Sequence, residues 1–132
     1  MMNEFLVVTG SLCLILALIE AWLLVIIFTN PDSGLSKIIP GSQDLLKSHI
    51  DYLLMSLFLF VFYMLFANFQ VKPSLFLIVS MCIGSVGNAG LFLIRAINPD
   101  FKSEPSTVFR LVMGISCFLT TIGYVGGAWL VW

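Results

Sequence analysis

The chain has 132 residues, of which 60% are hydrophobic and 10% charged, and its mean hydropathy is +1.08. An average soluble domain carries about 25% charged residues, and a domain of this size leaves much of its surface in contact with solvent. The composition therefore excludes a soluble protein, and a net charge of −1 provides no basic surface for nucleic acid. We expect an integral membrane protein whose main partner is the lipid bilayer, with no nucleic-acid partner.

The chain contains apolar stretches long enough to cross the hydrocarbon core as helices, which takes about 20 residues each. These stretches are residues 5–29, 45–67, 75–97 and 108–131. Residues typical of turns, chiefly Asn, Pro, Gly and Ser, separate them. Helices of this length with short connections predict a single all-α transmembrane domain over residues 1–132, folded as an antiparallel four-helix bundle.

The first stretch is interrupted by Glu20, which falls near the middle of the membrane. An ionisable side chain at that depth is costly, so it marks either a structural pair or a functional site. We expect Glu20 to be protonated and hydrogen-bonded within the bundle, or paired with a basic group of a neighbouring helix. The functional interpretation is a proton or cation site.

His49, the single histidine of the chain, lies about one turn into the second stretch. Helical spacing places His49, Tyr52 and Ser56 on one face, whereas Asp51 points elsewhere. His49 either hydrogen-bonds a carbonyl near the membrane interface or ligates a metal or haem through its neutral imidazole. A single histidine excludes a bis-histidine haem within one chain and permits a five-coordinate one.

The third stretch carries Asn88 and Arg95 on one helical face. Asn88 is an amide in the middle of a span and must find hydrogen-bond partners. Arg95 is close enough to the helix end to extend to the interface. Alternatively it contacts an acidic side chain such as Glu20 or Asp51, or an anionic group such as a haem propionate, to which a guanidinium is well suited.

Small residues recur at helical spacing in the last two stretches. These residues are Gly84, Gly87, Gly90, Gly123, Gly126 and Gly127. Small residues allow transmembrane helices to approach closely, so we expect tight helix contacts at both places.

The basic residues are distributed unevenly among the connections and helix ends. The first and third connections with their flanks hold five of the six, namely Lys37, Lys47, Arg95, Lys102 and Arg110, whereas Lys72 lies in the second connection. This asymmetry predicts that the first and third connections are cytoplasmic and both termini outside. We expect a bacterial inner-membrane location.

Three segments together resemble the styrene oxide isomerase family, to which the hydroxylaminobenzene mutases are related. The segments are Pro40-Gly41-Ser42 with the following Ser48-His49, Gly84-Ser85-Val86-Gly87-Asn88-Ala89-Gly90, and Ile97-Asn98-Pro99-Asp100. The resemblance covers about the middle 60 residues of the chain.

The resemblance implies a four-helix membrane protein that associates as a trimer and holds haem b near a subunit boundary. His49 would then be the axial metal ligand, with Tyr52, Asn88 and Arg95 as further candidate cofactor-binding residues. Ferric iron would act as a Lewis acid on the epoxide oxygen of a small apolar substrate, giving an epoxide-to-carbonyl isomerase. The polar residues of that family's active site are replaced here by Met55, Gly84 and Phe92, so the catalytic residues and the substrate are not assigned.

Three classes of function therefore stay open. The first is a haem-b protein of the isomerase-like type that forms a homo-oligomer, because a bundle this small has little interior for a ligand of that size. The second is a proton-coupled transporter of the small multidrug type, with Glu20 as its membrane-embedded acid. The third is a non-catalytic subunit of a larger membrane complex.

Overall fold

The structure is a computed structural model that describes residues 3–132. Within that range, four helices are long and apolar enough to cross a membrane, and no strand occurs. They are α1 (Glu4–Thr29), α3 (Ser42–Asn68), α4 (Leu75–Ile97) and α6 (Thr107–Val131). Two short helices, α2 (Gly34–Ile38) and α5 (Asp100–Ser103), lie in the first and third connections. The expected all-α membrane bundle is confirmed.

Serine residues begin three of the helices. The hydroxyls of Ser33, Ser74 and Ser106 accept hydrogen bonds from backbone N–H groups in the first turns of α2, α4 and α6, respectively. Such caps satisfy N–H groups that have no partner inside the helix. The polar residues between the apolar stretches therefore begin the next helix as well as ending the previous one.

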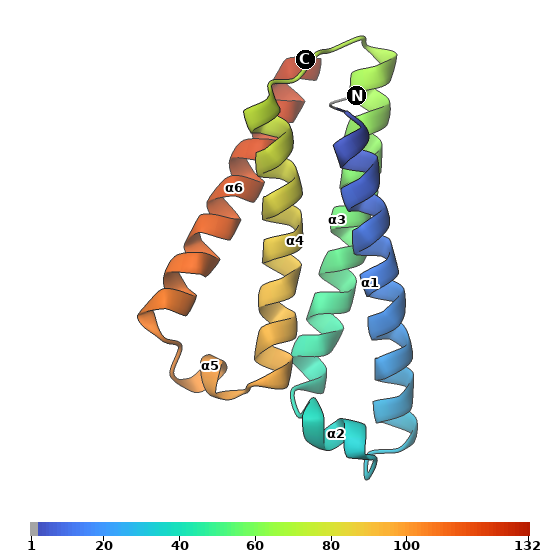
Figure 1. Ribbon diagram of the computed structural model, residues 1–132, viewed down its shortest axis with the longest axis vertical. Coiled ribbons are helices and arrows are strands. Elements are labelled where there is room, and N and C mark those ends of the chain that lie inside the picture. Colours follow the sequence, from blue (N-terminus) through green and yellow to red (C-terminus); the bar gives the residue numbers. More distant parts are fainter. Residues whose placement is uncertain (1–2) are drawn as a thin grey trace.

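The helices pack in a row rather than in a closed square (Figure 1). The α1 helix packs along α3, α3 packs against α4, and α6 packs mainly against α4. Both chain ends lie at one end of the molecule, and α2 and α5 lie at the other (Figure 1). The first and third connections therefore share one side of the bundle, as an antiparallel arrangement requires.

Glycines set the closest contact between α4 and α6. A Cβ atom on Gly84 would lie 2.6 Å from the backbone nitrogen of Thr120, and one on Gly123 would lie 2.8 Å from that of Met81. Both distances are below van der Waals contact, so only glycine fits there. Towards its N-terminal end α6 diverges from α4 (Figure 1), and residues 110–115 are all exposed.

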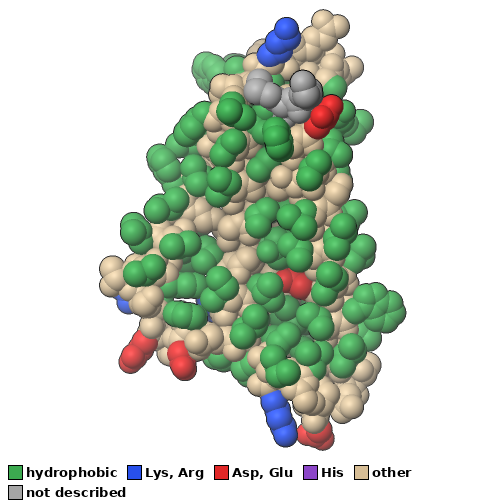
Figure 2. Space-filling view, in the orientation of Figure 1, with side chains coloured by type: hydrophobic (Ala, Val, Ile, Leu, Met, Phe, Trp, Pro, Cys, Tyr) green, Lys and Arg blue, Asp and Glu red, His purple; other side chains and the backbone are tan. Residues whose placement is uncertain are grey.

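The molecular surface is largely apolar. Hydrophobic side chains cover the middle of the face in Figure 2, and the Lys and Arg side chains visible there lie towards the ends of the molecule. Many large hydrophobic side chains are exposed, among them Trp22 and Trp129, which are 70% and 76% exposed. A soluble monomer rarely exposes so extensive an apolar surface. This surface suits a lipid bilayer environment.

Candidate functional site

Polar side chains from neighbouring helices meet inside the apolar bundle at similar depths. Glu20 of α1 and Asn88 of α4 each lie about 14 Å from the helix end nearest α2 or α5, given the rise of about 1.5 Å per residue. Ser48 of α3 lies about 9 Å from the corresponding end of its helix. We call Glu20, Ser48, His49, Asp51 and Asn88 the polar layer. It lies within the hydrocarbon thickness of about 30 Å.

Glu20 is 3% exposed and is hydrogen-bonded to Ser48, which is fully buried. The Ser48 Oγ atom lies 2.7 Å from Glu20 Oε1 and 3.1 Å from the carbonyl oxygen of Ala89 in α4. The other carboxyl oxygen, Oε2, is buried and has no hydrogen-bond partner. The Ser48 hydroxyl therefore connects α1, α3 and α4 at the buried acid.

His49 follows Ser48 but faces the backbone of α1. Its Nδ1 atom lies 2.8 Å from the carbonyl oxygen of Ala17. A carbonyl only accepts hydrogen bonds, so Nδ1 carries the hydrogen and donates it. In a neutral ring this leaves the lone pair of Nε2 free for another partner.

Asn88 is paired with Asp51. The Asn88 side-chain nitrogen donates to Asp51 Oδ2 at 2.7 Å, and the Cys117 thiol of α6 donates to Asn88 Oδ1 at 3.6 Å. The amide in the middle of α4 thus has partners on both neighbouring helices. Asn88 is therefore hydrogen-bonded, as expected, and its partners belong to α3 and α6.

Arg95 lies at the end of α4 and pairs with Asp44 in the first turn of α3. Its Nη2 atom is 3.7 Å from Asp44 Oδ1. Neither Glu20 nor Asp51, the acidic partners considered from the sequence, forms an ion pair with Arg95 within residues 3–132. Arg95 lies near Asp44 because a hydrogen bond of 2.9 Å from Gly41 N to Ala96 O holds the chain entering α3 against the end of α4.

The four candidate cofactor residues have different surroundings. His49 is bonded to α1, Asn88 to Asp51, and Arg95 to the charged end of the bundle. Tyr52 is 3% exposed and lies near Gly90, where an added Cβ atom would be 3.3 Å from its hydroxyl. These contacts therefore place the four side chains in separate local surroundings, and their shared role in binding a cofactor stays a prediction.

Two residues of the site were missed by the sequence interpretation, namely Asp44 and the serine that bonds Glu20. A usable signal existed, because polar residues recur every four positions in α3. These residues are Asp44, Ser48, Tyr52 and Ser56, and each is at most 3% exposed. A spacing of four places side chains on one helical face, and in a membrane helix a polar face is expected to turn inward.

The layer has no ready metal-binding cluster. In the part of the chain that the structure describes, no group of three or more His, Cys, Asp and Glu side chains could hold a metal ion. Within the same residues, the ion pairs converge on Asp44, and none involves Glu20. Glu20 is thus a buried acid whose partner is a neutral hydroxyl.

Comparison of the chain with protein-family models, with curated proteins and with solved structures found no match. The resemblance to styrene oxide isomerases therefore has no support beyond the short motifs that suggested it.

Proposed function

We propose that the protein is a small proton-coupled transporter in which Glu20 exchanges a proton for a lipophilic cation. The observation that carries the proposal is the position of Ser48 Oγ between Glu20 Oε1 and Ala89 O, at 2.7 and 3.1 Å. A hydroxyl has one hydrogen to donate and lone pairs with which to accept. Ser48 can therefore form a hydrogen bond with either protonation state of Glu20.

The two protonation states of Glu20 differ in which acceptor receives the single hydroxyl hydrogen of Ser48. When Glu20 is ionised, Ser48 donates to its carboxylate. When Glu20 is protonated, Glu20 donates to Ser48 Oγ and Ser48 donates to Ala89 O. Neither state requires a helix to move, so loss or gain of a proton at Glu20 leaves the local packing in place.

The surroundings of Glu20 favour exchange over a fixed charge. An ionised carboxylate in the hydrocarbon region is stabilised mainly by a cation or by several hydrogen bonds, and Glu20 Oε2 has no hydrogen-bond partner. The charged and titratable residues of α3 around Ser48 have other partners: Lys47 pairs with Asp44, His49 is bonded to Ala17 O, and Asp51 accepts a hydrogen bond from Asn88. A cation that replaces the proton would complete the site, and apolar surroundings favour a lipophilic one.

Proton release on ligand binding tests this proposal. We expect that adding tetraphenylphosphonium to the protein in weakly buffered detergent solution releases protons, because the cation replaces the proton of Glu20. Glu20→Gln should abolish both release and binding, whereas Glu104→Gln, the same change in the exposed connection before α6, should leave both intact. Binding that releases no protons, or that survives in Glu20→Gln, would contradict the proposal.

One observation favours haem as a second candidate. The hydrogen bond from His49 Nδ1 to Ala17 O orients the ring and leaves Nε2 available as a metal ligand, the arrangement usual for ligating histidines. Since the described residues hold no metal cluster, His49 would be the only protein ligand, which suits a haem iron. Bound haem would supply an iron with an open coordination position.

The haem candidate also predicts a homo-oligomer. An apolar groove of about 420 Å³ between α1 and α4 is lined by residues including Thr9, Leu12 and Cys82, and does not include His49. A haem on His49 would therefore need surface from a second copy. A Soret band that disappears in His49→Ala, from a species with the mass of an oligomer, would support this candidate. A colourless protein purified from haem-supplemented cells would eliminate it.

A further inference from the structure

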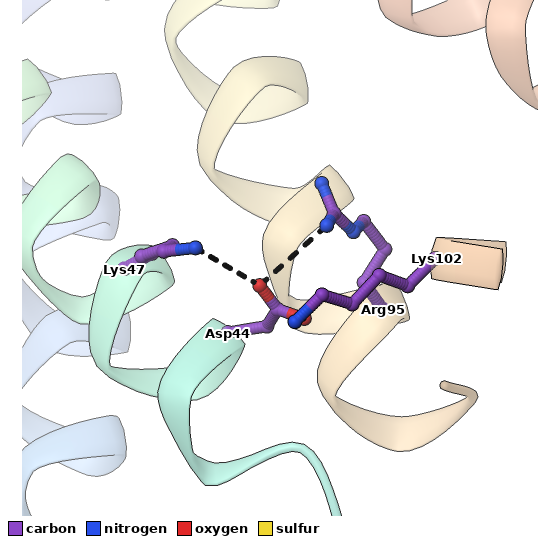
Figure 3. Close-up of polar contacts among 4 residues, drawn as sticks. All are labelled: Asp44, Lys47, Arg95 and Lys102. Carbon is purple, nitrogen blue, oxygen red and sulfur yellow. Dashed lines mark ion pairs between the residues drawn. The ribbon is translucent and has the colours of Figure 1, made fainter. Parts of the chain in front are cut away.

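One buried carboxylate at the end of the bundle is shared by three cations. Asp44 Oδ1 lies 3.6 Å from Lys47 Nζ and 3.7 Å from Arg95 Nη2, and Asp44 Oδ2 lies 3.9 Å from Lys102 Nζ. Figure 3 shows these side chains converging from α3, α4 and α5 on Asp44. Three positive charges face one negative charge, so the cluster has an excess of two positive charges.

The cations of this cluster have unused hydrogen-bonding capacity. Charge-assisted hydrogen bonds are about 2.7–2.9 Å long, shorter than all three distances to Asp44. Arg95 Nε is buried and has no hydrogen-bond partner, although buried polar groups nearly always have one. Lys47 and Lys102 are 54% and 52% exposed, so their ammonium groups can turn towards a ligand from outside.

The backbone holds the cluster beside a cavity. A Cβ atom on Gly41 would lie 2.8 Å from Ala96 Cα, so the chain entering α3 lies directly on the end of α4. A cavity of about 280 Å³ opens there, lined by the segment 40–44 together with Pro99 and Lys102. It lies at the ends of membrane-spanning helices, which is the level of lipid headgroups.

We propose that this cluster binds a phosphate-bearing anion. Arg95 offers a planar guanidinium that matches phosphate geometry, Lys102 lines the cavity, and Lys47 adds a further mobile charge. Asp44 keeps the cations together and also lines the cavity, but its side chain is 4% exposed and both of its oxygens lie within 4 Å of a cation, so its charge is more than compensated. The phosphate belongs either to a phospholipid headgroup or to a soluble compound. The inference does not rest on Glu20 or on transport.

Retention of lipid by single-charge variants tests the site. Wild type and Lys102→Gln are incorporated into vesicles of mixed phosphatidylglycerol and phosphatidylcholine, extracted, and analysed for bound lipid by native mass spectrometry. We expect Lys102→Gln to retain about fivefold less phosphatidylglycerol, as for loss of one basic residue near an anionic surface. The control is Lys37→Gln, which removes an exposed lysine in α2 at the same end of the bundle and should retain as much as wild type.

Inorganic phosphate distinguishes the two sources. If it raises the thermal stability of wild type but not of Lys102→Gln, and no lipid is retained, the ligand is a soluble phosphate compound. Retention of phosphatidylglycerol without an effect of inorganic phosphate identifies a lipid headgroup. The proposal would be overturned if Lys102→Gln and Lys37→Gln lost equal amounts of retained phosphatidylglycerol. It would also be overturned if wild type neither retained phosphatidylglycerol nor was stabilised by inorganic phosphate.

Discussion

At Ser48, one hydroxyl hydrogen serves two acceptors that belong to different helices. Glu20 Oε1 lies 2.7 Å and Ala89 O 3.1 Å from its Oγ atom. Because a hydroxyl can both donate and accept a hydrogen bond, Ser48 is compatible with either charge state of Glu20. The proposed exchange therefore depends on the serine as well as on the acid.

Replacing Ser48 with alanine removes the hydrogen-bond partner of Glu20 while keeping the acid. We expect the free energy of unfolding to fall by about 1 kcal/mol, because buried polar atoms lose a partner but hydrogen bonds in membrane proteins are worth little more than in water. Thermal unfolding in detergent measures this change. Ser56→Ala, a buried serine two turns further along the same face, is the control for cavity formation. An equal loss in both variants would show that the bond to Glu20 contributes nothing specific.

At the scale of the helices, contact between α4 and α6 depends on positions without side chains. Gly84 faces the backbone of Thr120, and Gly123 faces that of Met81. Packing rather than hydrophobicity drives association of helices in lipid, so we expect the close approach at these two positions to contribute to holding α6 on α4. The Cys117 contact to Asn88 lies along this same helix pair.

Gly84→Ala tests this contact. We expect a loss of about 1–3 kcal/mol, because the added methyl group meets backbone atoms of Thr120 that cannot rotate away. Gly114→Ala, in the diverging half of α6, has open space and should leave stability unchanged or raise it by up to about 1 kcal/mol. Unfolding of both variants in the same detergent measures the difference. If Gly84→Ala is as stable as Gly114→Ala, the close approach is not needed.

The sequence predicts the helices and the need for polar partners better than it predicts the partners. Glu20 and Asn88 are identified as costly residues from their depth in apolar stretches, and the glycines as sites of close approach. The identity of the partners depends on the rotation and axial shift of one helix relative to another, which periodicity within a single helix does not contain. Arg95 illustrates this, since its partner Asp44 is brought near by the contact of Gly41 with Ala96.

At the scale of the whole molecule, the charges are concentrated at one end. The α2 and α5 helices and the Asp44 cluster lie there, opposite both termini (Figure 1). An excess of basic residues on one side of a membrane protein predicts that this side is cytoplasmic. The structure places the first and third connections on the same side, and the direction of insertion stays a prediction.

Cysteine accessibility tests the orientation. In a cysteine-free background, Asn3→Cys should react with a membrane-impermeant maleimide in intact cells, because the N-terminal end is predicted to lie outside. Ser103→Cys, at the end of α5, should react only after the membrane is permeabilised. The reverse pattern would place the Asp44 cluster outside the cell, where positive charges are not normally concentrated.

The claim that Glu20 exchanges its proton is tested most directly by infrared difference spectroscopy of the protein in lipid as the pH is changed. A protonated carboxyl group has a C=O stretching band that disappears on ionisation. We expect this band to be present in wild type, to shift in Ser48→Ala because its hydrogen bond is lost, and to be missing in Glu20→Gln. Addition of tetraphenylphosphonium should bleach it in wild type. A band that is unaltered by pH and by the cation would show that Glu20 is a permanently protonated structural acid, and would contradict the proposed exchange.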